Sequence, residues 1–368
     1  MKILHLSSEA TWRGGEQQIA YLLQESIKAK VQVMVLCRKD SPFEHFCQNE
    51  NIPYKTTSFK HQYHLGTAKA IKKVCQQFKP DLLHLHSSKA HGAAILANLL
   101  GNKTSIILSR RVDFPVKKSW PTQFKYNHHS IKKIICVSDT IRKITAQGIQ
   151  HPEKLVTIHS GIDINKFLKE KPDSKWFHEK FGIAKDKKLI GNTSALAPHK
   201  DYFTFIDTAH LLLQKRNDLH FLIIGKGALK AELQAYVKQK GIENQITFTG
   251  FLKNIPEVLP QLDVFLMTSE TEGLGTSVLD AFAAKVPVVA TAGGGIPEMV
   301  IHKKTGMLAP IKAYNKLSEY VLEVLQNKKL NETLVFNASE KVKEFSKEIT
   351  AAKNIAVYKK VLDIDIID

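Results

Sequence analysis

The sequence predicts an α/β protein built from two Rossmann-like, doubly wound domains that face a cleft. The first observation is length, because 368 residues exceed one typical domain and suit two hydrophobic cores. The second is that short apolar runs alternate with segments of helical length, as in a parallel sheet covered by helices. The third is that this alternation stops and restarts, so each half of the chain is expected to carry its own sheet.

The first half contains six apolar runs that we expect to be strands, separated by helical segments. The expected strands are Lys2–Leu6, Val31–Leu36, Leu82–Leu85, Ser105–Leu108, Lys133–Val137 and Leu155–Ile158. The expected helices include Glu16–Lys28, Thr67–Phe78, Ala90–Leu100 and Thr140–Gln147. In such sheets ligands bind beyond the carboxyl ends of the strands, so the loops that follow strands are where function is expected.

The second half repeats the pattern after a polar stretch that contains Gly161, Pro172 and Asp173. The expected strands are Leu189–Gly191, Leu219–Gly225, Gln245–Phe248, Val264–Met267 and Val286–Ala290, and the expected helices include Phe203–Lys215, Leu229–Lys240 and Ser277–Ala284. We therefore expect domains at 1–165 and 170–348, with a C-terminal helix at about 350–368 that packs back on the first domain.

Composition narrows the class of protein. The N-terminal apolar run is too short for a signal peptide, and no stretch approaches the roughly 20 apolar residues of a membrane-spanning helix. We therefore expect a cytoplasmic protein. The four cysteines lack a C-x-x-C spacing, which favours reduced, mostly buried thiols over a disulfide framework or a zinc site.

The net charge of +18 is concentrated in one part of the chain. Residues 51–150 contain 17 Lys and Arg against 3 acidic residues, whereas residues 1–50 contain six of each sign. Such a field raises the local concentration of anionic partners. Solubility alone would also explain it, but the clustering favours an acidic substrate or an anionic membrane surface.

The segment from Ser269 to Val300 carries the most specific pattern. An apolar strand leads to Glu272, a glycine-containing loop follows, and the next helix carries Asp280. If that helix begins near Gly275, its free amides, with that of Thr276, form an anion site between two carboxylates that can accept hydroxyl donors. A diphosphate flanked by two polyols is what a nucleotide-sugar presents.

This segment resembles the donor-binding motif of the family 4 glycosyltransferases, retaining enzymes of GT-B fold, with Asp280 in place of the commoner Glu. The resemblance implies that Glu272 contacts the donor sugar and Asp280 the ribose, with Gly273, Leu274, Gly275 and Thr276 forming the loop between them. It also implies that residues 1–165 bind the acceptor and residues 170–348 the donor. No metal or cofactor is expected, because the nucleotide-sugar is a co-substrate.

Matches to the same family extend over nearly the whole chain. Gly14 and Gly15 resemble the family's loop beside the donor phosphates. Lys200, in Leu196-Ala197-Pro198-His199-Lys200-Asp201, resembles the lysine that neutralises the diphosphate, although the family's arginine about five residues earlier is absent. His86 follows the strand at Leu82–Leu85 and best matches a histidine beside the transferred sugar. The resemblance thus implies catalytic roles for His86, Lys200 and Glu272.

Three further residues are acceptor candidates. Arg110 and Arg111 follow a strand, where guanidinium groups can hold an anion by forked hydrogen bonds, and His91 follows His86 in the same region. Downstream, Lys117, Lys118, Trp120, Phe124, Lys125 and Tyr126 mix bases with aromatics. That mixture suits a membrane interface as well as it suits a helix with one face in the core.

The expected function is therefore transfer of a hexosyl or related sugar to an anionic or lipid-linked glycan, in the synthesis of a cell-envelope polysaccharide, lipopolysaccharide or glycolipid, with peripheral membrane contact. One alternative is a nucleotide-sugar epimerase or sugar phosphorylase of the same fold. Another is a non-catalytic relative that binds anions or nucleic acid, but the basic stretch lacks a recognisable nucleic-acid module. His84 and His86 form a His-x-His pair, and we expect no metal there because spacing places no third ligand.

Overall fold

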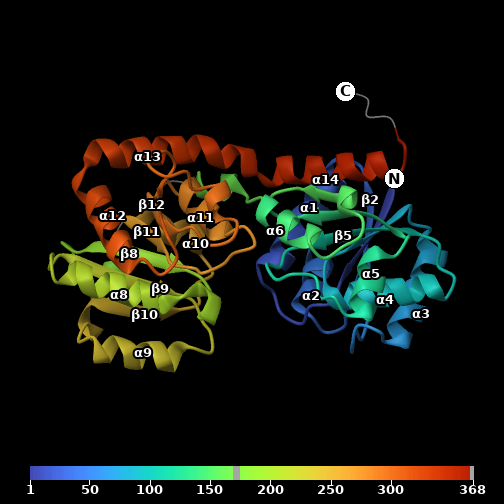
Figure 1. Ribbon diagram of the computed structural model, residues 1–368, viewed down its shortest axis with the longest axis horizontal. Helices are drawn as coiled ribbons and strands as arrows, with labels where there is room; N and C mark the ends of the chain where they lie inside the picture. Colours follow the sequence, from blue (N-terminus) through green and yellow to red (C-terminus); the bar gives the residue numbers. More distant parts are fainter. Residues whose placement is uncertain (169–174, 365–368) are drawn as a thin grey trace. The chain divides into compact units, whose positions relative to one another are not determined.

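A computed structural model describes residues 1–168 and 175–364 and confirms two Rossmann-like α/β domains (Figure 1). The chain forms two compact units. The first contains Met1–Gly161 and the chain from Lys347 onward, and the second contains Ile162–Ser346.

Two of the expected features include residues outside the described part of the chain. Pro172 and Asp173, expected at the boundary, fall there, as does the end of the helix expected to reach residue 368. The C-terminal helix α14 spans Lys347–Val361, and its Tyr358 is fully buried in a core that it shares with the first strand of the N-terminal unit.

The N-terminal unit is a seven-stranded parallel sheet in the order β3-β2-β1-β4-β5-β6-β7. Its strands are β1 (Lys2–Ser7), β2 (Gln32–Arg38), β3 (Tyr54–Thr57), β4 (Leu82–Leu85), β5 (Ser105–Arg110), β6 (Ile131–Cys136) and β7 (Leu155–Thr157). The pairing of β1 with β4 places His5 beside His84 in register. Because side chains alternate along a strand, both imidazoles point to the same face of the sheet.

Helices cover both faces of this sheet. They are α1 (Gly14–Lys28), α2 (Pro42–Asn49), α3 (Leu65–Phe78), α4 (Ser88–Leu99), α5 (Trp120–Asn127), α6 (Asp139–Ala146) and α14. One apolar core lies mainly among β4, α3 and α4, and the other places α14 and α1 on the opposite face. Strands β1 and β4 are buried on both sides, as expected of a sheet between two helical layers, and apart from His5 and His84 their buried residues are mainly apolar.

The second unit is a six-stranded parallel sheet in the order β10-β9-β8-β11-β12-β13. Its strands are β8 (Lys188–Thr193), β9 (Leu219–Ile224), β10 (Ile246–Gly250), β11 (Val264–Met267), β12 (Val288–Thr291) and β13 (Met307–Ala309). Its α-helices are α7 (Trp176–Phe181), α8 (Tyr202–Leu213), α9 (Lys230–Gln239), α10 (Ile255–Val258), α11 (Thr276–Ala283), α12 (Tyr314–Gln326) and α13 (Lys328–Lys341). Two apolar clusters pack against its two faces.

The sequence also led us to expect reduced cysteines and no membrane-spanning helix. All four cysteines are buried free thiols, as the sequence predicted. Over residues 1–168 and 175–364, no helix combines the length and apolar character needed to cross a bilayer.

Candidate functional site

In the second unit the site begins where β11 ends. The hydroxyl of Thr268 donates to the backbone oxygen of Asp201 over 2.9 Å, which ties this strand end to the loop after β8. The next residue, Ser269, donates to a carboxylate oxygen of Glu272 over 2.7 Å. Both hydroxyls are fully buried, so each satisfies its donor while fixing the loop.

Lys200 and Glu272, two of the expected catalytic residues, are brought together. The Lys200 ammonium lies 2.5 Å from the Glu272 carboxylate, and the side chains are only 15% and 10% exposed. Lys200 ends the short 3₁₀ helix Pro198–Lys200, and the backbone N–H of Glu270 donates to the carbonyl of His199 over 2.9 Å. The pair is therefore held by backbone contacts from both loops.

Glycines explain how the chain can pack so closely around Glu272. A Cβ on Gly294 would lie 2.1 Å from the Glu272 carbonyl oxygen, and a Cβ on Gly293 would lie 2.3 Å from that of Ser269. Gly294 also has a φ of +59°, which disfavours other residues. The Gly-Gly-Gly run after β12 thus allows the backbone of the Glu272 loop to approach.

The loop continues into α11 as expected. Gly275 caps the helix at a φ of +90°, and α11 begins at Thr276, so its first amides are free to bind an anion. Asp280 lies farther along this helix. Burial raises the pKa of its carboxyl to about 7, against an opposing effect from Lys166. Leu274 is buried beneath the loop in the apolar core.

In the N-terminal unit, Gly14 and Gly15 form the start of α1, as expected for a helix N-terminus that can approach an anion. A Cβ on Gly14 would meet nothing within 4 Å, and one on Gly15 would meet only Arg111, at 3.9 Å. The Glu16 carboxylate accepts the backbone N–H of Arg13 over 3.0 Å, which caps the helix. Burial raises the pKa of Glu16.

His86 lies in a cluster of three histidines. Nδ1 of His5 is 3.0 Å from Nε2 of His86, and the His84 ring centroid lies 4.1 Å from that of His86. Burial lowers the pKa of all three, that of His5 to about 3, and the charge of Arg111 lowers the values for His84 and His86 further. The imidazoles are therefore neutral near pH 7.

The structure supplies the third histidine that spacing alone did not place. His5, His84 and His86 offer ligand atoms that all lie within 4.8 Å of one another, and neutral imidazoles are zinc ligands. However, both ring nitrogens of His84 already have hydrogen-bond partners, and the Arg111 cation acts on the cluster. These contacts oppose the addition of a second positive charge.

His91 and Arg110 make internal contacts instead of facing the histidine cluster. His91 is 1% exposed and hydrogen-bonds through Nε2 to the Lys125 carbonyl over 3.0 Å. Arg110 donates to the Tyr126 hydroxyl over 2.6 Å and to the Phe114 carbonyl. Both side chains thus hold α5 and the loop before it, and their roles in binding the acceptor stay predictions. Arg111 instead lines a pocket together with Ser109 and Ser160.

Sequence reasoning missed four polar residues near these groups: His5, Ser109, Ser160 and Tyr358. His84 contacts the Tyr358 hydroxyl over 2.5 Å and the Ser109 hydroxyl over 2.8 Å. The only signal for His5 was its position on a strand that pairs with β4. Tyr358 had no local signal, because it lies 274 residues from its partner.

Two known protein families match the chain. Residues 12–166 match the family described as Glycosyltransferase Family 4, and residues 173–341 match the family described as Glycosyl transferases group 1. The chain is 25% identical over 310 residues to an N-acetyl-alpha-D-glucosaminyl L-malate synthase of Bacillus anthracis, covering 82% of this chain and 81% of that protein. It is 25% identical over 334 residues to the putative glycosyltransferase EpsD of Bacillus subtilis, covering 86% and 85%.

Solved structures show the same fold. A glycosyltransferase from Rickettsia africae has a TM-score of 0.88 at 19% identity and covers 99% of each chain. Alr3699/HepE of Anabaena, solved in complex with UDP and glucose, has a TM-score of 0.85 at 20% identity and covers 98% of this chain and 99% of its own.

Proposed function

The chain belongs to the family 4 glycosyltransferases, and we propose that it moves a sugar from a nucleotide-sugar to an acceptor with retention of anomeric configuration. The observation that carries this proposal is the Lys200–Glu272 pair beside the free amides of α11. In this arrangement Glu272 accepts hydroxyls of the donor sugar, Asp280 accepts those of the ribose, and Lys200 faces the diphosphate.

The proposed reaction breaks the bond between the anomeric carbon and the phosphate oxygen. Negative charge develops on the departing nucleoside diphosphate, where Lys200 and the amides at Gly275 and Thr276 stabilise it. The acceptor hydroxyl attacks from the same face, and the departing phosphate takes its proton. Neutral His86 lies beside the transferred sugar and offers a hydrogen bond. This chemistry needs no metal or other cofactor.

The donor is tested by thermal unfolding with UDP-, GDP- and ADP-sugars. A ligand that binds only the folded state raises the melting temperature according to its concentration over Kd. We expect a shift with one nucleotide class that weakens in Glu272→Ala, with Glu270→Ala as the matched control because Glu270 is a more exposed acid two residues away. If no nucleotide-sugar shifts the wild-type transition, the proposal is wrong.

Retention is tested on the product. The anomeric proton coupling in the NMR spectrum of the new glycoside is compared with that of the donor. The same configuration supports the same-face mechanism, and inversion excludes it. Release of free sugar phosphate, or a changed sugar without any acceptor, would instead indicate the phosphorylase or the epimerase.

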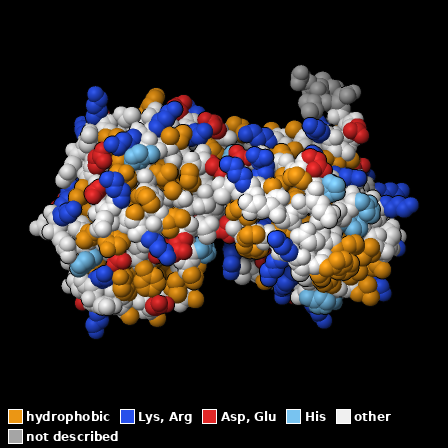
Figure 2. All heavy atoms as spheres, viewed as in Figure 1, with side chains coloured by type: hydrophobic (Ala, Val, Ile, Leu, Met, Phe, Trp, Pro, Cys, Tyr) orange, Lys and Arg blue, Asp and Glu red, His pale blue; other side chains and the backbone are white. Residues whose placement is uncertain are grey.

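We propose that the acceptor is an anionic or lipid-linked glycan of the cell envelope and that the N-terminal unit contacts a membrane surface. Trp120 is 75% exposed and stacks on Phe124 with ring centroids 5.4 Å apart, and Phe114 is also exposed. Figure 2 shows apolar side chains gathered over the region of α4 and α5, with Lys and Arg side chains near them. Lys117 and Lys118 in the preceding loop are exposed. Aromatic rings beside cations suit an anionic interface.

Membrane contact is tested by co-sedimentation with vesicles that contain anionic or only zwitterionic lipid. We expect binding to the anionic vesicles that falls in Trp120→Ser. Phe336→Ser is the matched control, because Phe336 is a similarly exposed aromatic residue on α13 of the other unit. Equal loss in both variants, or no binding by the wild type, would contradict the contact.

A further inference from the structure

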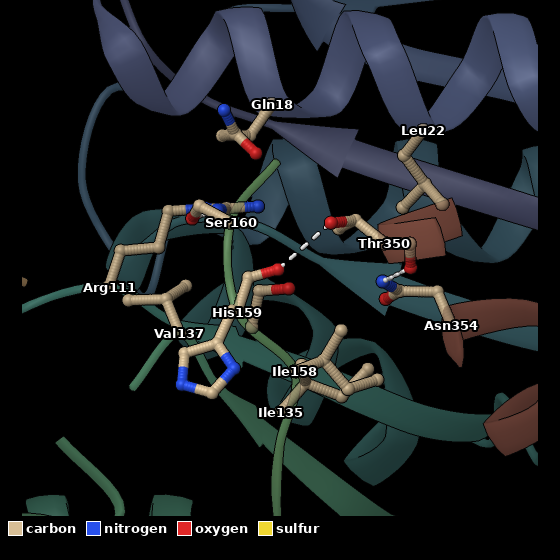
Figure 3. Close-up of a pocket in the computed structure, with 11 residues that line it drawn as sticks. Gln18, Leu22, Arg111, Ile135, Val137, Ile158, His159, Ser160, Thr350 and Asn354 are labelled. Atoms are coloured by element: carbon tan, nitrogen blue, oxygen red, sulfur yellow. Dashed lines mark hydrogen bonds between the residues drawn. The ribbon is translucent and has the colours of Figure 1, made fainter. Parts of the chain in front are cut away.

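A pocket opens in the N-terminal unit beside the end of β5 (Figure 3). It has about 300 Å³ of space between its atoms, much of it open to solvent, and its enclosed part is too small for a whole small-molecule ligand. Its polar lining includes Ser109 and Arg111 from the end of β5, Ser160 from the loop after β7, and Asn354 from α14. Such a space suits one small polar group of a larger molecule.

Arg111 is the cation of this pocket, and none of the described residues that line the pocket is an acid. Its guanidinium makes a long hydrogen bond, 3.4 Å from a terminal nitrogen to the Ser160 hydroxyl, and its Nε is buried with no partner among the described residues. Glu16 attracts it electrostatically but forms no ion pair with it in the described part of the chain. Burial lowers the pKa of Arg111 to about 10, so the group stays charged at neutral pH.

Arg111 is partly buried. An unpaired charge that has lost part of its hydration is costly, whereas one paired with an oxyanion through several hydrogen bonds is compensated. The planar guanidinium presents two parallel N–H donors that match a carboxylate or phosphate. Nε of Arg110 is also buried without a partner among the described residues, so the two arginines differ in their terminal nitrogens. Both terminal nitrogens of Arg110 donate to groups of the protein. The neighbouring arginines therefore divide into one that holds the loop and one that is available to a ligand.

A second donor is directed at the same pocket through a buried chain of hydrogen bonds. Tyr358 is fully buried, and its hydroxyl has one hydrogen-bond partner among the described residues, Nδ1 of His84. If Tyr358 donates to Nδ1, its proton is satisfied and His84 carries its own proton on Nε2. That proton is then donated to the Ser109 oxygen. The opposite tautomer would leave the Tyr358 proton buried without an acceptor, which is unfavourable.

This tautomer of His84 leaves the Ser109 hydroxyl available as a hydrogen-bond donor. Because its oxygen accepts from His84, the Ser109 hydroxyl proton is left to donate, and no acceptor within the described residues takes it. Ser109 lines the pocket together with Arg111. Tyr358, contributed by the C-terminal helix, thus acts as a positioning residue for a hydroxyl donor near the guanidinium.

We propose that Arg111, Ser109 and Ser160 form a subsite for an oxyanion, a phosphate or carboxylate group. The inference rests on the proposed function in one respect, which is that the group belongs to the acceptor. The donor diphosphate has the same chemistry, so the experiment must separate the two sources. The subsite itself requires only the contacts within the N-terminal unit.

The first experiment measures binding of inorganic phosphate and of acetate, by thermal unfolding and by titration calorimetry at constant ionic strength. We expect at least one of them to stabilise the wild type and to bind at least tenfold more weakly to Arg111→Gln. Arg142→Gln is the control, because Arg142 is an exposed arginine of the same unit that is ion-paired to Asp139. Loss in both variants, or no binding of either anion by the folded wild type, would overturn the subsite.

The source of the anion is decided by nucleotide-sugar binding to the same variants. If Arg111→Gln loses phosphate or acetate but keeps the nucleotide-sugar shift, the subsite serves the acceptor. If both are lost, it holds the donor diphosphate, and the assignment to the acceptor is wrong. If the wild type binds phosphate at Arg111 but no nucleotide-sugar, the proposed function fails while the subsite stands.

The positioning role of Tyr358 is tested by NMR measurement of the His84 tautomer. The ¹⁵N shifts of His84 should report a proton on Nε2 in the wild type, and Tyr358→Phe should shift that tautomer ratio and weaken anion binding several-fold. Ser109→Ala should weaken anion binding by a similar factor while leaving the His84 tautomer on Nε2. A wild-type His84 protonated on Nδ1, or unchanged anion affinity in both variants, would overturn the hydrogen-bonded chain.

Discussion

The two units hold their key cations differently. Lys200 of the C-terminal unit forms an ion pair with Glu272 at 2.5 Å, with both side chains largely buried. Among the described residues, the one hydrogen bond of Arg111 in the N-terminal unit is a 3.4 Å contact with a hydroxyl. A buried pair compensates the desolvation of both charges, whereas an unpaired cation leaves that cost to be met by a ligand. The comparison indicates that one unit orients its charges before binding and that the other depends on an anion.

The largest effect is expected when the ion pair of the C-terminal unit is broken. Lys200→Ala removes the cation that we propose faces the departing diphosphate, and loss of one such electrostatic contact lowers kcat by about 10²–10³-fold. It also leaves Glu272 as an uncompensated buried charge, which costs about 3–5 kcal/mol of unfolding free energy. Steady-state kinetics and denaturant unfolding measure the two effects.

A double variant separates stability from catalysis. Lys200→Met combined with Glu272→Gln removes both charges, so most of the lost unfolding free energy should return while activity stays low. Recovery of activity together with stability would mean that the pair is only structural. Arg111→Gln should not destabilise the protein in this way, because it leaves no partner carboxylate unpaired, and a comparable loss would erase the contrast between the units.

The units also differ in how much of the site their sequence reveals. In the C-terminal unit, Glu272, Gly275 and Asp280 lie in one short segment, because a single strand–loop–helix connection builds that part of the site. In the N-terminal unit, His84 meets Tyr358 from the far end of the chain, and it meets His5 through strand pairing. Local pattern cannot report contacts that depend on sheet order and on a helix that returns to the first unit.

The same limit applies to the fold. The long apolar strands were predicted close to their observed bounds, and β4 and β11 were predicted at those bounds. Strands β3 and β13 were missed, since each is a short edge strand with weak burial contrast. Side-chain contacts could not be predicted either. Arg110 and Arg111 are neighbours in the sequence and were both predicted to bind the acceptor, and only the packing around them shows that their contacts differ.

A smaller effect is expected from the glycine that lets the Glu272 loop pack. Gly294→Ala places a Cβ 2.1 Å from the Glu272 carbonyl oxygen and adds a residue that disfavours a φ of +59°. Overpacking of this kind costs about 1–3 kcal/mol, and the displaced loop should also weaken nucleotide-sugar binding.

Gly182→Ala is the matched control for Gly294→Ala. Gly182 has a similar φ of +64° but has nothing within 4 Å of the added carbon, so it reports backbone strain alone, about 1–2 kcal/mol. The difference between the variants in denaturant unfolding is the cost of the close approach. Equal losses, with nucleotide-sugar binding unchanged, would mean that the loop moves freely away and that Glu272 is not held by this contact.

The smallest effect is a pH dependence that belongs to the C-terminal unit. Burial raises the pKa of Asp280 to about 7, well above that of an ordinary aspartate. In the proposed site the ribose hydroxyls donate to the ionised form of Asp280. Donor affinity should therefore rise with pH through 7 and fall about tenfold per unit at pH well below it. In the free protein the sign is opposite, because the folded state retains a proton that the unfolded state releases. This group therefore lowers stability as pH rises from about 4 to 7.

Asp280→Asn should flatten both profiles, measured as nucleotide-sugar Kd and as unfolding free energy from pH 5.5 to 8.5. A wild-type Kd that does not change with pH would mean that Asp280 does not meet the ribose as a carboxylate.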